Sequence, residues 1–341
     1  MKFGSVLTSQ AVGAVLAHSL HVQSGVNGTS YRIAKGTVLT NEHTKDLLMD
    51  QQADIVVARL ESGDVEENEA ATRLAAAVAP DAAQFGVRIS AAGAGRVNLY
   101  AIKAGVVEID EAAVMALNAV DPMITMATVP QFHRTDSNGM IATIKIIAYS
   151  VPQSSLLQAA SVAANVIRIA TPQYRTATLI ETQVGDEMPS FKGRDAMRGR
   201  LDRFSVELLE RTVVPHNEAA ITTVLSEAEG EFVLLLTASA TSDPMDVGPQ
   251  ALRQAGGDVT GFGMPVDPGN LLFFGWLGSK PVIGLPGCAR SPALNGADWV
   301  LERLLCGISL SQRDIAAMGV GGLLKEIPTR PQPRARVQPR T

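Results

Sequence analysis

The stretch Phe232-Val233-Leu234-Leu235-Leu236 is an uninterrupted apolar run of strand length. Strands that are apolar throughout are typical of parallel sheets, because helices bury both of their faces. Strand and helix patterns alternate around this run from residue 176 onward. The sequence therefore predicts an α/β fold in which the C-terminal half holds a mostly parallel sheet with helices on both faces.

The alternation also predicts the individual elements of this half. We expect strands at residues 176–181, 211–214, 231–236, 270–276 and 280–285, and helices at 195–209, 249–256 and 293–305. A further helix should carry Ile221, Val224 and Leu225. The turn Leu277-Gly278-Ser279 separates the last two strands and predicts a hairpin.

The N-terminal half has a weaker pattern. Short strands at residues 55–58 and 105–109, a strand at 141–149, an alanine-rich helix at 66–78 and many glycines predict a smaller mixed α/β or β-rich domain of unknown role. A helix at 154–169 that ends before Thr171-Pro172 places the boundary near residue 172. We expect domains at 1–172 and 173–324, followed by a flexible Pro/Arg-rich tail at 325–341 that is either a solvated end or a linker toward a partner.

Composition limits the functional classes. The chain has 341 residues, 46% of them hydrophobic and 18% charged, and a net charge of −5. These values are typical of a globular protein and do not predict nucleic-acid or membrane binding. We find no secretory signal and no apolar run that approaches the ~20 residues of a membrane span, and we expect a cytoplasmic protein. The two cysteines, Cys288 and Cys306, cannot form a cysteine-rich zinc site.

Three loops lie at or near the expected carboxyl ends of apolar strands. They cover residues 237–249, 264–270 and 284–292. Ligands of open α/β sheets bind outside these strand ends, and small residues let the backbone approach a phosphate. In the third loop, Ser291-Pro292 predicts the N-cap and first residue of a helix whose N–H groups would face an anion, with Arg290 adding a charge. The loops predict an anion-binding site.

The order and spacing of these loops resemble the molybdopterin-binding domain that molybdopterin adenylyltransferases, molybdopterin molybdenumtransferases and gephyrin share. The most specific matches are the run Gly284-Leu285-Pro286-Gly287 and the register of Asp246-Val247 with Pro249. The resemblance implies catalytic roles for Asp246 and Asp243, and a Mg²⁺ ion at Asp246. It implies that the ligand is bound by Thr182, Thr237, Ala238, Ser239, Thr241, Ser242, Pro268, Gly269, Asn270, Gly284, Pro286, Gly287, Arg290 and Ser291. The structural alternative for Asp246 is a helix N-terminal residue favoured by the helix dipole.

The chain departs from this family at three places. Ala238 and Ser239 replace a glycine pair, His216 stands where an acid is usual, and the Asp-Gly-Tyr-Ala signature of the molybdenumtransferases is missing. His216 is either a ligand or metal contact, or a neighbour of the helix cap Asn217. These departures put catalysis in doubt more than binding.

Three functions follow from the resemblance. The first is binding of molybdopterin in molybdenum cofactor biosynthesis, with transferase activity either as adenylyl transfer from ATP, with AMP as the transferred group, or as molybdate insertion. The second is a non-catalytic carrier or chaperone of the cofactor. The third is hydrolysis of a nucleotide or nicotinamide derivative, because competence-damage-type proteins use a related domain. The family also implies a homo-oligomer, and other molybdenum cofactor enzymes as partners.

Overall fold

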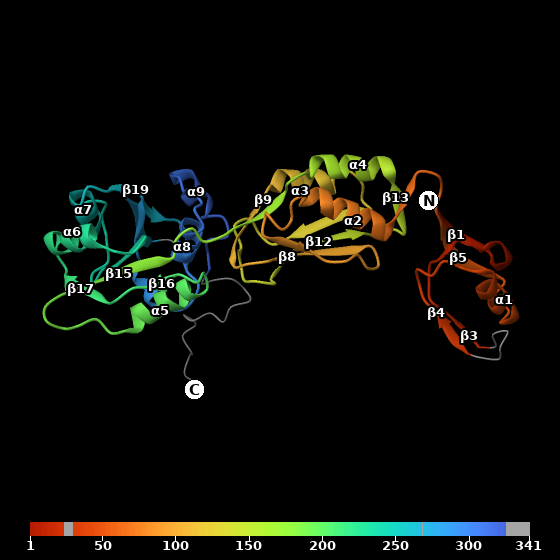
Figure 1. Ribbon diagram of the computed structural model, residues 1–341, viewed down its shortest axis with the longest axis horizontal. Helices are drawn as coiled ribbons and strands as arrows, with labels where there is room; N and C mark the ends of the chain where they lie inside the picture. Colours follow the sequence, from red (N-terminus) through yellow and green to blue (C-terminus); the bar gives the residue numbers. More distant parts are fainter. Residues whose placement is uncertain (24–29, 268, 325–341) are drawn as a thin grey trace, which may run out of the picture. The chain divides into compact units, whose positions relative to one another are not determined.

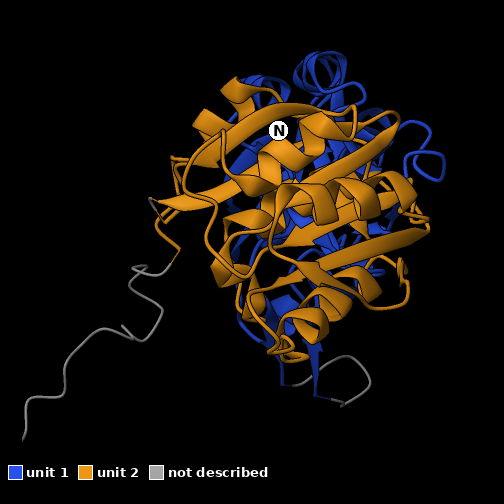
Figure 2. Ribbon diagram, turned by 90° about the vertical axis from the view of Figure 1, so that its left-hand side faces the viewer, with its two compact units in different colours: residues 1–103, 107–169 blue, residues 104–106, 170–341 orange. Residues whose placement is uncertain are grey.

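The computed structural model describes residues 1–23, 30–267 and 269–324. Two compact units make up the chain (Figure 2). Unit 1 comprises Met1–Lys103 and Val107–Ile169, and unit 2 comprises Ala104–Val106 and the residues from Ala170 onward. The Pro/Arg-rich tail predicted at 325–341 lies outside the described residues. None of the described helices has the length and apolar character that a membrane span requires.

Unit 1 has two apolar cores. The first forms among short strands and one helix: β1 (Lys2–Leu7), β2 (Val15–Leu16), β3 (Leu20–Val22), β4 (Tyr31–Ile33), α1 (Asn41–Met49) and β5 (Asp54–Arg59). A 3₁₀ turn, Thr8–Gln10, connects β1 to β2. Strands β1, β5 and β2 form one antiparallel sheet, and β3 pairs with β4.

The second core of unit 1 lies between helices and small sheets (Figure 1). Its strands are β6 (Asp64–Glu66), β7 (Val87–Ile89), β8 (Arg96–Ala101), β9 (Gly105–Ile109), β10 (Ile124–Thr128), β11 (Arg134–Thr135), β12 (Met140–Ile146), β13 (Ser150–Pro152) and β14 (Ile167–Ala170). Its helices are α2 (Glu67–Val78), α3 (Glu111–Asn118) and α4 (Gln153–Val162). The sheet orders are β10-β12-β8-β7 and β11-β9-β14, with β13 paired to β6.

The helix predicted at 154–169 is wrong in its second half. Helix α4 ends at Val162, and Asn165 has a left-handed backbone with φ 58° that a helix cannot contain. The β-branched residues after Asn165 then form strand β14.

Unit 2 contains the predicted mostly parallel sheet. Its seven strands are β15 (Thr176–Gln183), β16 (Glu207–Leu208), β17 (Thr212–Pro215), β18 (Phe232–Leu236), β19 (Asp258–Met264), β20 (Asn270–Leu277) and β21 (Lys280–Gly284). The order is β16-β15-β18-β21-β20-β19, and β17 also pairs with β15. The pairs among β16, β15, β17, β18 and β21 are all parallel. The predicted hairpin makes β20 antiparallel to β21, and β19 also pairs antiparallel with β20.

Helices cover both faces of this sheet. They are α5 (Lys192–Asp202), α6 (Glu218–Glu227), α7 (Val247–Gln254), α8 (Gly296–Leu305) and α9 (Gln312–Ala317), with a 3₁₀ turn η2 (Gly287–Arg290). Gly248 of α7 packs against Leu235, whereas Gly193 of α5 packs against Leu236. Because consecutive strand residues point to opposite faces, α5 and α7 lie on opposite sides of the sheet.

The helix predicted at 195–209 is shifted and too long. Helix α5 starts at Lys192 and ends at Asp202. Ser205 has a left-handed φ of 56°, and the residues after it form β16, which pairs with β15.

Candidate functional site

The topology of unit 2 gathers the predicted loops at one edge of the sheet. Gln183 at the end of β15 is in register with Pro215 at the end of β17, and Leu235 near the end of β18 with Gly284 at the end of β21. Asn270 at the start of β20 is in register with Met264 at the end of β19. Neighbouring strands lie about 4.8 Å apart, so the three steps from β15 to β20 span about 15 Å.

Thr182 connects the first loop to the neighbouring strands. Its buried hydroxyl oxygen accepts a hydrogen bond from the backbone N–H of Ala238 at 2.7 Å, and lies 3.0 Å from Nδ1 of His216. Thr237, the residue before Ala238, donates its hydroxyl to the carbonyl of Ser239 at 2.6 Å. The first loop is therefore held largely by its own contacts and by Thr182.

Two other residues of this loop carry hydroxyl groups that make no hydrogen bond within the described part of the chain. They are Ser239, which is exposed, and Thr241, which is buried. Ser242 differs from them, because its hydroxyl donates to the carbonyl of Ala240 at 3.3 Å. Ser239 and Thr241 thus retain donors for a ligand.

The two aspartates predicted as catalytic make local backbone contacts. Asp246 is the N-cap of α7, and its two carboxylate oxygens accept from the N–H groups of Val247 at 2.7 Å and Ser242 at 2.9 Å. Asp243 accepts from the N–H of Met245 at 2.7 Å. Among the described residues, no group of three His, Cys, Asp or Glu side chains could hold a metal ion. The catalytic and metal-binding roles of Asp246 and Asp243 stay predictions.

Arg290 joins the third loop to the first. Its guanidinium donates to the carbonyl of Thr237 at 2.7 Å and has no carboxylate partner in the described part of the chain. Lys192, the first residue of α5, is exposed and forms no ion pair with a described residue. The next residue, Gly193, lies against Arg290, since a Cβ placed there would be 3.4 Å from Cγ of Arg290. The unpaired charge of Arg290 therefore lies beside the first loop, and the exposed Lys192 precedes the residue that contacts Arg290.

A third cation lies deeper. Arg194 is 5% exposed, donates one nitrogen to the carbonyl of Leu209, and buries its Nη1 without a hydrogen-bond partner. Burial lowers the pKa of this guanidinium below its usual value, and the neighbouring charge of Arg198 adds to the effect.

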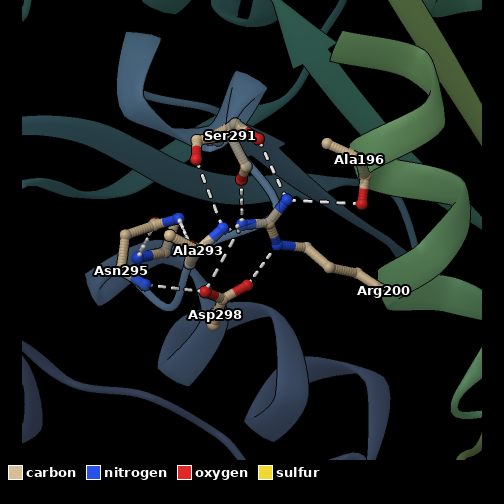
Figure 3. Close-up of polar contacts among 8 residues, drawn as sticks. Ala196, Arg200, Ser291, Ala293, Asn295 and Asp298 are labelled. Atoms are coloured by element: carbon tan, nitrogen blue, oxygen red, sulfur yellow. Dashed lines mark hydrogen bonds and ion pairs between the residues drawn. The ribbon is translucent and has the colours of Figure 1, made fainter. Parts of the chain in front are cut away.

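The third loop is held by a buried arginine that the sequence did not reveal as part of the site (Figure 3). Arg200 of α5 forms an ion pair with Asp298 of α8, and each side chain is 8% exposed. The same guanidinium donates to the carbonyls of Ala289 at 3.0 Å, Ser291 at 2.8 Å and Ala293 at 3.2 Å. These contacts fix the path of the loop from inside.

The predicted helix start at Ser291-Pro292 is wrong. Helix α8 begins at Gly296, and its N-cap is Asn295, whose side chain accepts from the N–H of Ala297 at 2.9 Å. Asp298 completes a capping box by accepting from the N–H of Asn295 at 2.8 Å. Ser291 instead ends the 3₁₀ turn η2, for which Pro286 is the N-cap.

The two glycines of the Gly-Leu-Pro-Gly run differ in their surroundings. A Cβ at Gly284 would lie 1.8 Å from Cε1 of Phe273, so this glycine is required by packing. A Cβ at Gly287 would have only Nη1 of Arg290 near it, at 3.8 Å. Gly287 therefore faces open space beside Arg290, where a ligand has room.

The second loop contributes an amide. Pro268 lies outside the described residues, and Gly269 has a positive φ of 95° that favours glycine. Asn270 is 7% exposed, and its Oδ1 has no hydrogen-bond partner among the described residues. A buried amide oxygen without a partner costs about 1–3 kcal/mol, which a ligand donor would recover.

The sequence missed several residues that shape this edge, among them Lys192, Arg194, Arg200, Glu181 and Asp298. The signal that could have revealed the arginines and Lys192 is the set of basic residues in α5, which are interspersed with the apolar residues of this helix. A buried Glu or Arg on such a face implies a partner, but the sequence does not say which.

Comparisons with known proteins find matches only among solved structures. No family model and no curated protein matches the chain. A molybdopterin biosynthesis MoeA protein from Pyrococcus horikoshii is 13% identical, with 90% of this chain and 75% of that chain covered and a TM-score of 0.32. A second MoeA structure from the same organism is 11% identical, with 92% of this chain and 76% of that chain covered and a TM-score of 0.26. A molybdenum cofactor biosynthesis protein from Pyrococcus furiosus is 12% identical, with 85% of this chain and 59% of that chain covered and a TM-score of 0.23. The chain is thus similar to solved structures of molybdenum cofactor biosynthesis proteins, at identities and TM-scores that do not identify its own function.

Proposed function

We propose that the carboxyl edge of the unit 2 sheet binds molybdopterin, a pterin with a terminal phosphate, as part of molybdenum cofactor biosynthesis. The observation that carries this proposal is Arg290, which bridges the third loop to Thr237 of the first and has no carboxylate partner among the described residues. An arginine that is fixed on one side by a carbonyl and left without a counter-ion favours an anionic ligand.

The neighbouring groups suit a phosphate. Lys192 adds a second unpaired cation, and Ser239 and Thr241 add hydroxyl donors. Gly287 leaves room for close approach. The terminal phosphate would be held by these side chains, with the amide of Asn270 contacting a polar group farther along an extended ligand.

The carrier role has specific support within this proposal. The N–H of Ala238 stands where the family has a glycine-rich phosphate loop, but it donates to Thr182. Asp246 uses its carboxylate oxygens on backbone N–H groups. Magnesium and ATP or AMP therefore remain expectations from the resemblance, and we derive no catalytic step through a metal.

The test is to incubate the purified full chain anaerobically with molybdopterin, first alone and then with ATP and Mg²⁺. Retention without turnover supports the carrier, and an adenylylated product supports the transferase. Replacing Lys192 by Ala should weaken retention, whereas Lys103→Ala in unit 1, where the lysine is also exposed, should leave it unchanged. Failure of the wild-type chain to retain molybdopterin would overturn the proposal.

A further inference from the structure

Phe191 is an exposed aromatic residue with a fixed orientation. It precedes α5 as its N-cap residue, and 60% of its surface is exposed. The guanidinium carbon of Arg211 lies 4.2 Å from the centre of its ring. This contact is a cation–π stack that covers one face of the ring and leaves exposed surface for a ligand.

A buried carboxylate holds Arg211 in place. Nε of Arg211 donates to Oε2 of Glu181 at 2.8 Å, Nη2 lies 3.4 Å from Oε1, and Nη2 also donates to the carbonyl of Pro189. Glu181 is only 2% exposed. Arg211 cannot turn away without leaving a buried charge unpaired, so the stack with Phe191 is firmly anchored.

Phe191 also stands next to the candidate anion site. Lys192 follows it directly, and Gly193 packs against Leu236 at the end of β18 and against Arg290. The β15–α5 connection that leads to Phe191 exposes two further apolar side chains, Val184 and Met188. Exposed apolar and aromatic side chains therefore lie along the segment that leads directly to Lys192.

We propose that Phe191 is the platform on which the planar heteroaromatic ring of a phosphate-bearing ligand stacks, while the phosphate meets Lys192 and Arg290. This inference rests on the proposed function. It places the ring on the β15 side of the site, whereas the amide of Asn270 would contact a polar group at the other end of the ligand. A planar ring stacks on an aromatic side chain with little conformational cost, because the platform is already fixed. A pterin and an adenine share this chemistry.

The test uses the full chain and three ligands: a pterin monophosphate, AMP and inorganic phosphate. Aromatic stacking of a base contributes about 1–3 kcal/mol, so Phe191→Ala and Phe191→Leu should raise Kd for the ring-bearing ligand by roughly five- to 150-fold. Phe191→Trp should retain binding and the quenching of pterin fluorescence. Inorganic phosphate should bind all variants alike, since it has no ring.

The control variant is Phe3→Ala in unit 1, where the phenylalanine is 56% exposed, and it should leave every Kd unchanged. If only AMP loses affinity in Phe191→Ala, the stacked ring is the adenine; if only the pterin does, it is the pterin. Equal binding of both ring-bearing ligands by the wild type and Phe191→Ala overturns this inference and leaves the proposed function standing. Failure of the wild type to retain molybdopterin overturns the proposed function instead.

Discussion

Arg200 and Asp298 form a buried ion pair that joins α5 to α8 beneath the third loop (Figure 3). Removing one partner of a buried pair leaves an uncompensated charge, which typically costs about 3–5 kcal/mol. We therefore expect Asp298→Ala to lower the free energy of unfolding by about that amount, measured by urea denaturation. The matched control is Arg168→Ala, which breaks the more exposed pair with Glu108 and should cost at most about 1 kcal/mol. Equal losses in the two variants would contradict a structural role for the buried pair.

Substitutions of Gly284 and Gly287, which belong to the same Gly-Leu-Pro-Gly run, should affect different properties: stability at Gly284 and ligand binding at Gly287. Gly284→Ala places a methyl group on Phe273 and should destabilise the fold by about 1–3 kcal/mol or more, seen as a lower urea midpoint. Gly287→Ala meets no close neighbour, so it should keep the stability and lower the affinity for molybdopterin. A stable Gly284→Ala protein that no longer binds the ligand would show that Gly284 serves the ligand rather than the packing.

Thr182 should control the first loop. Thr182→Val removes the acceptor of the Ala238 N–H, which should cost about 1–3 kcal/mol and speed hydrogen exchange of the Ala238 amide. Thr182→Ser keeps the hydroxyl and should restore most of the protection. His216→Ala removes the other partner of Thr182 and leaves the bond to Ala238 intact, so the Ala238 amide should stay protected. Fast exchange in His216→Ala would show that the histidine, and not Thr182 alone, holds the loop.

Tyr31 predicts how unit 1 responds to alkali. Burial, followed by the hydrogen bond to Asp46, raises the pKa of Tyr31 to about 12. Since an unfolded tyrosine has a pKa of about 10, folding favours the neutral phenol. This stabilisation is fully present below pH ~10 and is lost as the pH rises towards 12. Tyr31→Phe should therefore lose less stability than the wild type over that interval, measured by urea unfolding at several pH values. Parallel stability profiles in the two proteins would refute the assignment.

Local patterns predicted most of unit 2, because the elements there follow from short-range chemistry. The apolar run at 232–236 became strand β18, and the Leu277-Gly278-Ser279 turn became the predicted hairpin. The fold class is confirmed for the same reason: strand and helix periodicity is a property of neighbouring residues.

The wrong helix bounds arose where a contact distant in sequence or a single left-handed residue determines where a helix begins or ends. Ser291-Pro292 looks like a helix start, but Asn295 and Asp298 form the capping box, and Arg200, about a hundred residues away in sequence, fixes Asp298. The overlong helices at 154–169 and 195–209 stop at Asn165 and Ser205, whose left-handed conformations periodicity does not show. The candidate loops were found from their residues, whereas the basic residues of α5 beside them required the tertiary structure.

The reversal of β20 and β21 has a kinetic consequence for unit 2. These two strands are joined by a tight turn, and their pairing closes a short stretch of chain. Strand β18 must find β15 and β21 across much longer intervening segments. Short loops close faster than long ones, so the hairpin should form first and offer β21 as the edge that captures β18. The site's first and third loops, which follow β18 and β21, should then come together only after the hairpin has formed.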